Sequence, residues 1–404
     1  MNYIIRNITQ LVTCSGFFAK HGKEMSDLGI IENAAVVITK GIITYVGHSS
    51  NDLTLDNTVE YETIDATGKA VLPGFIDSHT HFVFGGFREE EFSQRMRGDD
   101  YLSILQRGGG IYNTVKATRK ASFEELYAIA EARLNKMRAM GVTTVEGKSG
   151  YGLDKETELK QLRVMKQLQK KSCMNIVSTY LGGHAVPEGY TEKSYVDFIL
   201  KEMLPIIKDE HLAECCDIFC EKGVFSTEES KRFLSNAGEM GFKLKLHADE
   251  IVDTGGAELA VSLGALSADH LLQASEKGIK ELATSNTIAT LLPCTAFSLK
   301  ENFAQGRAMI DAGCAIALAT DFNPGSCFSY SIPLTIALAC IYMKLSPEEA
   351  VTALTINAAA ALGQADSLGS IDVGKKGDII ILEFPSYKFL PYHVGINIVE
   401  KVIS

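Results

Sequence analysis

Two histidines separated by one residue close an apolar run in FIDSHTHFVFGGFR, residues 75–88. Side chains two positions apart on a strand point the same way, so His79 and His81 are expected to project together. The pair alone indicates little, because two hydrogen-bonded polar residues at a strand end have the same pattern. A chemical role therefore needs partners from elsewhere in the chain.

Three later apolar runs also end on an ionisable side chain. KLKLHADE reaches His247, ALSADH reaches His270 and ALATDFNPG reaches Asp321. Imidazole nitrogens and a carboxylate oxygen suit zinc or a similar transition ion. An ion with a position left open to water lowers the pKa of that water from about 16 toward about 7, and it polarises carbonyl groups. The set predicts metal-dependent hydrolysis.

The elements that must position these groups repeat along the chain. From about residue 70 to 360, apolar β-branched runs alternate with segments of helical apolar spacing, such as SFEELYAIAEARLNKMRAM, KSYVDFILKEMLPIIKD and TEESKRFLSNAGEM. The eight strand candidates cover residues 70–79, 141–148, 174–184, 215–225, 241–250, 265–270, 286–293 and 314–325.

This alternation predicts an α/β fold, a (β/α)₈ TIM-like barrel whose ionisable groups meet at the carboxyl ends of the strands. An open doubly wound sheet is the rival, but no Gly-x-Gly-x-x-Gly follows the first strand.

Both ends of the chain contain short strand-like runs and turns without long helices. NAAVVITKGIITYVG lies near the start, and GSIDVGKKGDIIILEFP lies near the end. We predict a small β-sandwich-like domain built from both termini, residues 1–66 and 361–404, around a hydrolase barrel at residues 67–360.

Composition narrows the partners and the location. A net charge of −11 without a basic cluster argues against nucleic acid or an anionic membrane surface as the main partner. No signal peptide and no apolar run of about 18 residues is evident.

The nine cysteines are an odd number, with three in CCDIFC and no Cys-x-x-Cys pair. We expect buried thiols in a reduced, cytoplasmic protein.

The motifs LPGFIDSHTH, HADE and ATDFNPG together resemble the metal-dependent amidohydrolase superfamily, over essentially the whole chain. More narrowly, HTHFVFGGFREEEF, EGKSGYGL, LGGHAVP and DFNPGS are similar to the amidohydrolases that open an imidazolone ring in histidine degradation. The resemblance implies hydrolysis of 4-imidazolone-5-propanoate to N-formimino-L-glutamate. It also implies one zinc or iron ion per subunit and a homodimer.

The same resemblance implies roles for individual residues. It implies metal ligation by His79, His81, His247 and Asp321. It implies substrate contacts by Arg88, Tyr151, His184, Glu250, Asn323, Gly325 and Ser326. Ser78 stands where similar enzymes often have cysteine, and its side chain is expected to face away. Binuclear relatives use a carboxylated lysine from a different strand context than Lys148, so one ion is expected.

These residue types could bind the implied substrate, which carries a carboxylate on a flexible arm. Arg88 offers a planar fork for that carboxylate, although without the resemblance a solvated arginine beside three glutamates would be favoured. Tyr151 suits a flat ring, or a structural role in the core. The DFNPGS turn could present backbone N–H groups with the Asn323 amide and Ser326 hydroxyl, but an ordinary turn has the same composition.

For the reaction we expect Asp321, with His270 beside it, to accept the proton of the attacking water. His184 would donate a hydrogen bond to the developing oxyanion. Glu250 would position the departing ring nitrogen and help move its proton. The division of proton transfer among Asp321, His270 and Glu250 stays open.

Two other functions fit part of this pattern. A metal-dependent deaminase of a nucleobase or related ring would use the spacing of His247 and Glu250, but it would release ammonia and give Arg88 no carboxylate to bind. A non-catalytic structural metal protein would favour cysteine ligands, and no cysteine stands at an expected ligand position.

Overall fold

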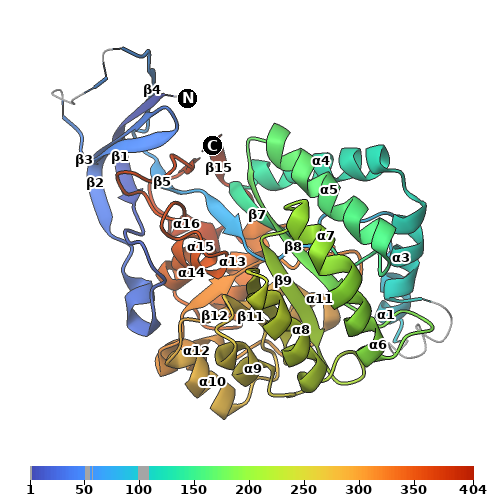
Figure 1. The fold of residues 1–404 in the computed structure, drawn as a ribbon. Helices are drawn as coiled ribbons and strands as arrows, with labels where there is room; N and C mark the ends of the chain where they lie inside the picture. The colour runs from blue at the N-terminus through green and yellow to red at the C-terminus, as the bar shows by residue number, and fades with distance from the viewer. Residues whose placement is uncertain (1, 51–54, 57, 99–108) are drawn as a thin grey trace.

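The computed structural model describes residues 2–50, 55–56, 58–98 and 109–404. Two sheets organise the described chain: an eight-stranded parallel sheet surrounded by helices, and a separate seven-stranded sheet at the chain ends (Figure 1). The predicted fold class, an α/β barrel with a terminal β-domain, is confirmed.

The parallel strands follow one another around the barrel in sequence order, from β6 to β13. Nearly all their residues are buried, which explains the near-continuous apolar runs. The strands are β6 (Phe75–Asp77), β7 (Val142–Lys148), β8 (Asn175–Gly183), β9 (Cys215–Cys220), β10 (Lys243–Ala248), β11 (Ser267–His270), β12 (Ile288–Leu291) and β13 (Ile316–Leu318).

The barrel closes between β6 and β13 just beyond the ends of both strands. Thr80 and Phe322 form a parallel bridge there. The backbone N–H of Asp321 donates to the carbonyl of His79 at 3.0 Å, and the N–H of His81 donates to the carbonyl of Phe322 at 2.9 Å. Residues 79–81 and 320–322, which we call the closing seam, therefore bring two histidines and an aspartate together through the backbone.

Asp77, the last residue of β6, reinforces this seam. Its buried carboxylate accepts the backbone N–H of Thr320 at 3.0 Å and the Thr320 hydroxyl at 2.6 Å. Burial raises the pKa of Asp77 to about 7, against these hydrogen bonds. Asp77 thus has a structural role at the join.

Helices cover the outside of the barrel (Figure 1). They are α1 (Glu89–Met96), α3 (Ile111–Lys120), α4 (Phe123–Ala139), α5 (Lys155–Lys171), α6 (Glu192–Phe198), α7 (Leu204–Asp209), α8 (Thr227–Glu239), α9 (Gly256–Ser262), α10 (Glu276–Ala283), α11 (Pro293–Leu299), α12 (Gly306–Ala312), α13 (Ile332–Ile341), α14 (Pro347–Ala353), α15 (Ile356–Ala361) and α16 (Phe389–Tyr392), with a 3₁₀ turn η1 (Gly22–Ser26). Ser122 caps α4 in a reciprocal capping box with Glu125.

The helix expected over residues 193–209 is interrupted. A π-helical turn, η2 (Ile199–Met203), separates α6 from α7, and the N–H of Leu204 donates to the carbonyl of Ile199. Pro205 follows at once, and it has no N–H to continue an α-helical ladder. The wider π-helical turn therefore lies where the missing N–H of Pro205 would interrupt an α-helical ladder.

The terminal sheet contains strands from both ends of the chain. Its order is β15-β14-β5-β1-β2-β3, with β4 paired to β1. The strands are β1 (Tyr3–Val12), β2 (Ile30–Thr39), β3 (Ile42–His48), β4 (Glu62–Asp65), β5 (Ala70–Pro73), β14 (Ile379–Leu382) and β15 (Val399–Ile403). Isoleucine and valine side chains from strands of both chain ends form its own core cluster.

One apolar run serves both sheets, which the sequence analysis did not predict. The expected strand 70–79 is divided at Gly74 into β5 of the terminal sheet and β6 of the barrel. A Cβ at residue 74 would lie 2.3 Å from the Thr143 side chain, so the crossing requires glycine. We therefore propose Gly74, in place of residue 66, as the first domain boundary, and keep 361–404 as the proposed C-terminal part.

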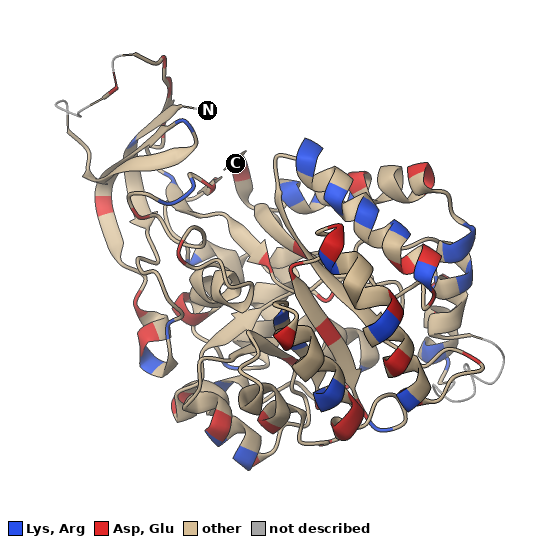
Figure 2. Ribbon diagram, viewed as in Figure 1, with Lys and Arg blue, Asp and Glu red and all other residues tan. Residues whose placement is uncertain are grey.

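Charged residues of both signs are interspersed over the outer helices (Figure 2). Among the described residues, no helix has the length and apolar character needed to cross a bilayer. All nine cysteines are free of disulfides, and those of β9 are buried as expected.

Candidate metal-dependent active site

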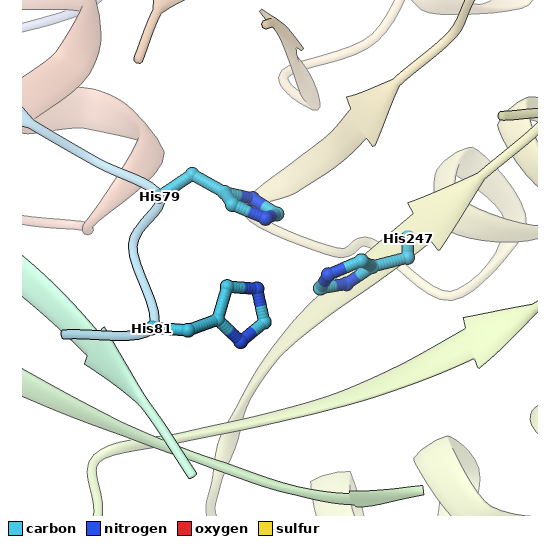
Figure 3. A group of neighbouring side chains, drawn as sticks. All are labelled: His79, His81 and His247. Carbon is cyan, nitrogen blue, oxygen red and sulfur yellow. The ribbon is translucent and has the colours of Figure 1, made fainter. Parts of the chain in front are cut away.

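Three imidazoles meet at the carboxyl ends of the barrel strands. His79 and His81 lie on the closing seam, and His247 lies near the end of β10 (Figure 3). One nitrogen from each ring lies within 4.8 Å of the others. All three residues are at most 3% exposed. The geometry therefore brings the three histidines around one small space, as the His-x-His spacing suggested.

Asp321 completes this group from the other side of the seam. Its Oδ1 lies 3.6 Å from Nε2 of His79 and 3.6 Å from Nε2 of His81. The Thr295 hydroxyl donates to Oδ2 at 2.6 Å, which leaves Oδ1 toward the imidazoles. Burial raises the pKa of Asp321 to about 6.

Two further carboxylates hold the rings in place. Asp269 Oδ2 lies 2.6 Å from Nδ1 of His79, and Asp217 Oδ2 lies 3.0 Å from Nδ1 of His247. A carboxylate at Nδ1 fixes the ring so that Nε2 points toward the shared space. The sequence analysis missed both carboxylates. The available signal was an acidic residue inside an otherwise apolar strand.

The donor atoms suit a cation. Nε2 of His79 and Nε2 of His247 are buried and have no hydrogen-bond partner among the described residues. Burial lowers the pKa of His79 and His81 well below the usual histidine value, so these rings are neutral and keep a lone pair. A buried unpaired nitrogen is costly unless a ligand satisfies it. Three imidazoles and one carboxylate match zinc or a similar ion.

The barrel strands also carry a group of buried charges, which we call the ion-pair layer: Glu146, Lys148, Asp217, Lys245 and Asp269. Lys148 Nζ lies 2.9 Å from Glu146 and 2.7 Å from Asp217. Burial alone would lower the pKa of Lys148, but these carboxylates raise it above its usual value. Lys148 is thus a paired ammonium here.

A second possible cation group, formed by His79, Glu146 and Asp269, overlaps the ion-pair layer. Lys148 lies 3.6 Å from Asp269, and Lys245 lies 3.6 Å from Glu146 and 3.7 Å from Asp269. Two ammonium groups already supply positive charge at these carboxylates. This arrangement supports the expectation of a single ion.

His184 and Tyr151 form an aromatic wall beside His81. The His184 ring stacks on the His81 ring with centroids 5.1 Å apart, and the Tyr151 ring lies 5.2 Å from His184. Nδ1 of His184 lies 3.1 Å from the Gly150 carbonyl, which can only accept, so Nδ1 carries the proton. Burial lowers the pKa of His184 to about 3. In this tautomer Nε2 of His184 is left as an acceptor, whereas the sequence analysis expected a donor to the oxyanion.

Glu250 and His270 lie on another side of the site. Glu250 Oε2 is 3.6 Å from Nε2 of His270, and the His270 ring lies 5.3 Å from His79 and 5.1 Å from His247. Burial, together with the charges of Asp321 and Glu221, raises the pKa of Glu250 to about 8. The Glu250 carboxyl is thus protonated at neutral pH and can donate a proton.

Arg88 lies against the turn at residues 323–326, a contact that the sequence analysis did not predict. A Cβ at Gly325 would lie 2.1 Å from Nη1 of Arg88. Asn323, however, is used within the turn: its Oδ1 accepts the N–H groups of Gly325 and Ser326, each at 2.8 Å, and its Nδ2 donates to Ser326 Oγ at 2.8 Å. The Ser326 hydroxyl accepts there and keeps its own proton to donate.

The expected residues are thus distributed around one centre. His79, His81 and Asp321 meet at the seam with His247 of β10 facing them, and the aromatic wall and the Glu250–His270 pair lie beside them. Ser78 is buried, and its hydroxyl has no hydrogen-bond partner among the described residues. The structure adds residues that the sequence analysis missed: Glu91, Glu146, Asp217, Lys245, Asp269 and Thr295.

Comparisons with known proteins agree with this geometry. Amidohydrolase family models match residues 62–101 and 210–403. The imidazolonepropionase of Parabacteroides distasonis is 61% identical, over 99% of this chain and 97% of its own length. That of Clostridium tetani is 60% identical, over 100% of this chain and 97% of its own.

Solved structures with low identity share the fold. An adenosine deaminase from Xanthomonas campestris with bound zinc has a TM-score of 0.72 at 19% identity, covering 99% of this chain and 91% of its own. The atrazine chlorohydrolase from Arthrobacter aurescens in complex with zinc has a TM-score of 0.71 at 18% identity, covering 94% and 87%. On the full-length similarity to the curated relatives, the chain belongs to the imidazolonepropionase family of amidohydrolases.

Proposed function

We propose that the protein hydrolyses 4-imidazolone-5-propanoate to N-formimino-L-glutamate, a ring-opening step of histidine degradation. The observation that carries this proposal is a cluster of imidazoles with unpartnered nitrogens and one carboxylate, together with a partly buried guanidinium that lies against the turn following Asp321. The cluster suits hydrolysis of a cyclic amide, and the guanidinium suits a propanoate arm. The 61% identical relative is named for the same activity.

We propose one zinc or iron ion per subunit, held by His79, His81, His247 and Asp321. Neutral imidazoles with unpartnered nitrogens and a nearby carboxylate oxygen support this set. When bound, such an ion supplies hydroxide at neutral pH and polarises the amide carbonyl. Asp269, bonded to Nδ1 of His79, and Asp217, 3.0 Å from Nδ1 of His247, would keep these two rings oriented.

The chain's own groups can then move the protons. Asp321 accepts the proton of the attacking water at its carboxylate, whose Oδ1 faces the imidazoles. The Glu250 carboxyl, protonated at neutral pH, donates a proton to the departing ring nitrogen. His270, whose nitrogens have no hydrogen-bond partner among the described residues, lies 3.6 Å from Glu250 and can relay a proton from water to the Glu250 carboxylate after this group has donated its own. His184 accepts an N–H of the substrate ring at Nε2.

The remaining residues would bind and orient the substrate. Arg88 would bind the carboxylate of the arm, and Tyr151 would pack against the ring. Ser326 would donate its hydroxyl proton, while Asn323 and Gly325 would give the turn its shape. Their hydrogen bonds to one another support this division.

The test is a metal analysis combined with an assay on purified protein. We expect about one equivalent of zinc or iron, consumption of 4-imidazolone-5-propanoate, formation of N-formimino-L-glutamate and no release of ammonia. Ammonia release from this or a nucleobase substrate would favour the deaminase. A bound ion without turnover of either substrate class would favour a structural metal protein.

We also propose a cytoplasmic homodimer. Reduced cysteines support the location. Exposed apolar side chains at the end of α13, Ile341 and Tyr342 at 58% and 56% exposure, support an interface. Light scattering after size exclusion should give twice the 43.9 kDa chain mass. The chain mass alone would contradict the dimer.

A further inference from the structure

The guanidinium of Arg88 is held by the carboxylate of Glu91, to which the sequence analysis gave no role. Glu91 Oε2 lies 2.8 Å from Nε and 2.8 Å from Nη2 of Arg88. The two side chains are only 11% and 10% exposed, so solvent screens this pair little. Glu91 stands in the first turn of α1, one helical turn after Arg88.

The second oxygen of Glu91 fixes the carboxylate itself. Oε1 accepts the backbone N–H of Gly110 at 3.1 Å and the Asn113 Nδ2 at 2.7 Å. These donors stand at the start of α3. The Glu91 carboxylate is therefore bound on both oxygens and cannot turn without losing hydrogen bonds, which makes it a rigid support for Arg88.

A second arginine lies at the same turn. Nη2 of Arg95 donates to the Gly325 carbonyl at 3.0 Å, while Nε of Arg95 is buried without a partner among the described residues. Burial and the nearby charge of Arg88 lower the pKa of Arg95. The carboxylate of Glu91 balances one guanidinium, so the three side chains retain one positive charge.

A guanidinium has five N–H groups. Glu91 takes the side formed by Nε and Nη2, and the Gly325 backbone lies against Nη1. The fork left for a planar anion is the one between Nη1 and Nη2. Two parallel N–H groups in this position match the two oxygens of one carboxylate.

We propose that Glu91 is a positioning residue that presents the Nη1–Nη2 fork of Arg88 to the carboxylate arm of the substrate, with Arg95 supplying the uncompensated positive charge. The inference rests on the proposed function, because it concerns the arm of that substrate. Its physical basis is preorganisation. Glu91 already holds the Arg88 side chain in one conformation, so substrate binding does not have to order it.

The test uses the full-length, metal-loaded protein with two substrates, 4-imidazolone-5-propanoate and its propanamide analogue, which lacks the arm charge. Glu91→Gln should raise KM for the propanoate about tenfold to a hundredfold, the range for one hydrogen bond to a charged group, with kcat nearly unchanged. KM for the propanamide should stay at the wild-type value, because the amide does not need the aligned charged fork.

Arg88→Lys should give a similar rise in KM, and the double variant should be no worse than either single variant, since both changes remove one interaction. Glu91→Asp keeps the charge and should recover part of the affinity. Glu90→Gln, at an exposed position of the same helical turn, is the matched control and should match wild type.

Three results would overturn the inference: an unchanged KM in Glu91→Gln, equal losses on both substrates, or additive effects of the two changes. Melting temperature and metal content show whether Glu91→Gln is folded, and if it is not, Glu91→Asp carries the test. Failure of the proposed function is separate, because wild-type protein would then turn over neither substrate.

Discussion

Two groups of buried polar side chains inside the barrel differ in how they are satisfied. In the ion-pair layer, every charged group has an opposite charge within 4 Å, as for Lys148 between Glu146 and Asp217. In the imidazole group of His79, His81, His247 and His270, each ring keeps a buried nitrogen without a hydrogen-bond partner among the described residues. Burial makes both arrangements costly unless they are completed.

This difference indicates a structural role for the ion-pair layer and a chemical role for the imidazole group. Every charge of the ion-pair layer has an opposite charge beside it, so this layer can stabilise and orient, although Glu146 Oε2 and Asp269 Oδ1 have no hydrogen-bond partner among the described residues. The unpartnered nitrogens of the imidazole group gain a partner only when a ligand such as a metal ion binds. Changes in the first should mainly affect stability or orientation, and changes in the second should mainly affect metal and turnover.

The largest effect should come from Asp321→Ala, in the imidazole group's own site. We expect kcat to fall by about 10²–10⁴-fold, the range for a lost proton acceptor, and metal content to fall with it. Steady-state assays and elemental analysis measure both. Full activity in this variant would remove Asp321 from the mechanism.

Lys148→Met tests the ion-pair layer. It leaves the buried carboxylate of Asp217 without its ammonium and Glu146 with only the more distant Lys245, so the free energy of unfolding should fall by about 3–5 kcal/mol. Urea unfolding of metal-free protein measures this. Lys155→Met, which removes an exposed pair with Glu202, should change little. Equal effects of the two changes would contradict the distinction.

Asp269→Asn tests the contact between the two groups. Asp269 orients His79 through Nδ1, and removing such a carboxylate typically weakens metal affinity by about 10–100-fold. Competition with a chelator measures the affinity, and Asp253→Asn at an exposed site is the control. Unchanged affinity would show that the ring needs no carboxylate.

The smallest effect concerns pH. Burial and neighbouring carboxylates raise the pKa of Glu250 to about 8, so the donating, protonated form is present below this pH and is lost above it. We expect kcat to fall about tenfold per pH unit above about 8. A kcat that stays level to pH 10 would exclude Glu250 as the proton donor.

Sequence patterns predicted which strand ends carry the clustered imidazoles because these positions depend on local order. An apolar strand that ends on a polar residue places that residue at the barrel mouth, whichever strand carries it, so His247, His270 and Asp321 could be read individually. The same logic failed for residues 70–79, because local pattern does not say which sheet a strand joins. Only the close approach to Thr143 at Gly74 decides that.

Composition was also insufficient for the turn at residues 323–326. Its donors were expected to face a ligand, but Asn323 takes two of the backbone N–H groups itself. Whether a donor is free depends on its neighbours' conformation, which residue types alone do not specify. The sequence could not predict which ring nitrogen of His184 carries the proton either, because this depends on the contact of Nδ1 with the Gly150 carbonyl.

The sequence by itself determined the barrel, the terminal sheet and the residue types at the strand ends, because strand period and apolar runs are short-range properties. The tertiary structure alone decided which carboxylates orient the imidazoles and how Arg88 is held. Asp269 and His79 are 190 positions apart in the chain, and a contact at that separation exists only once the barrel has closed.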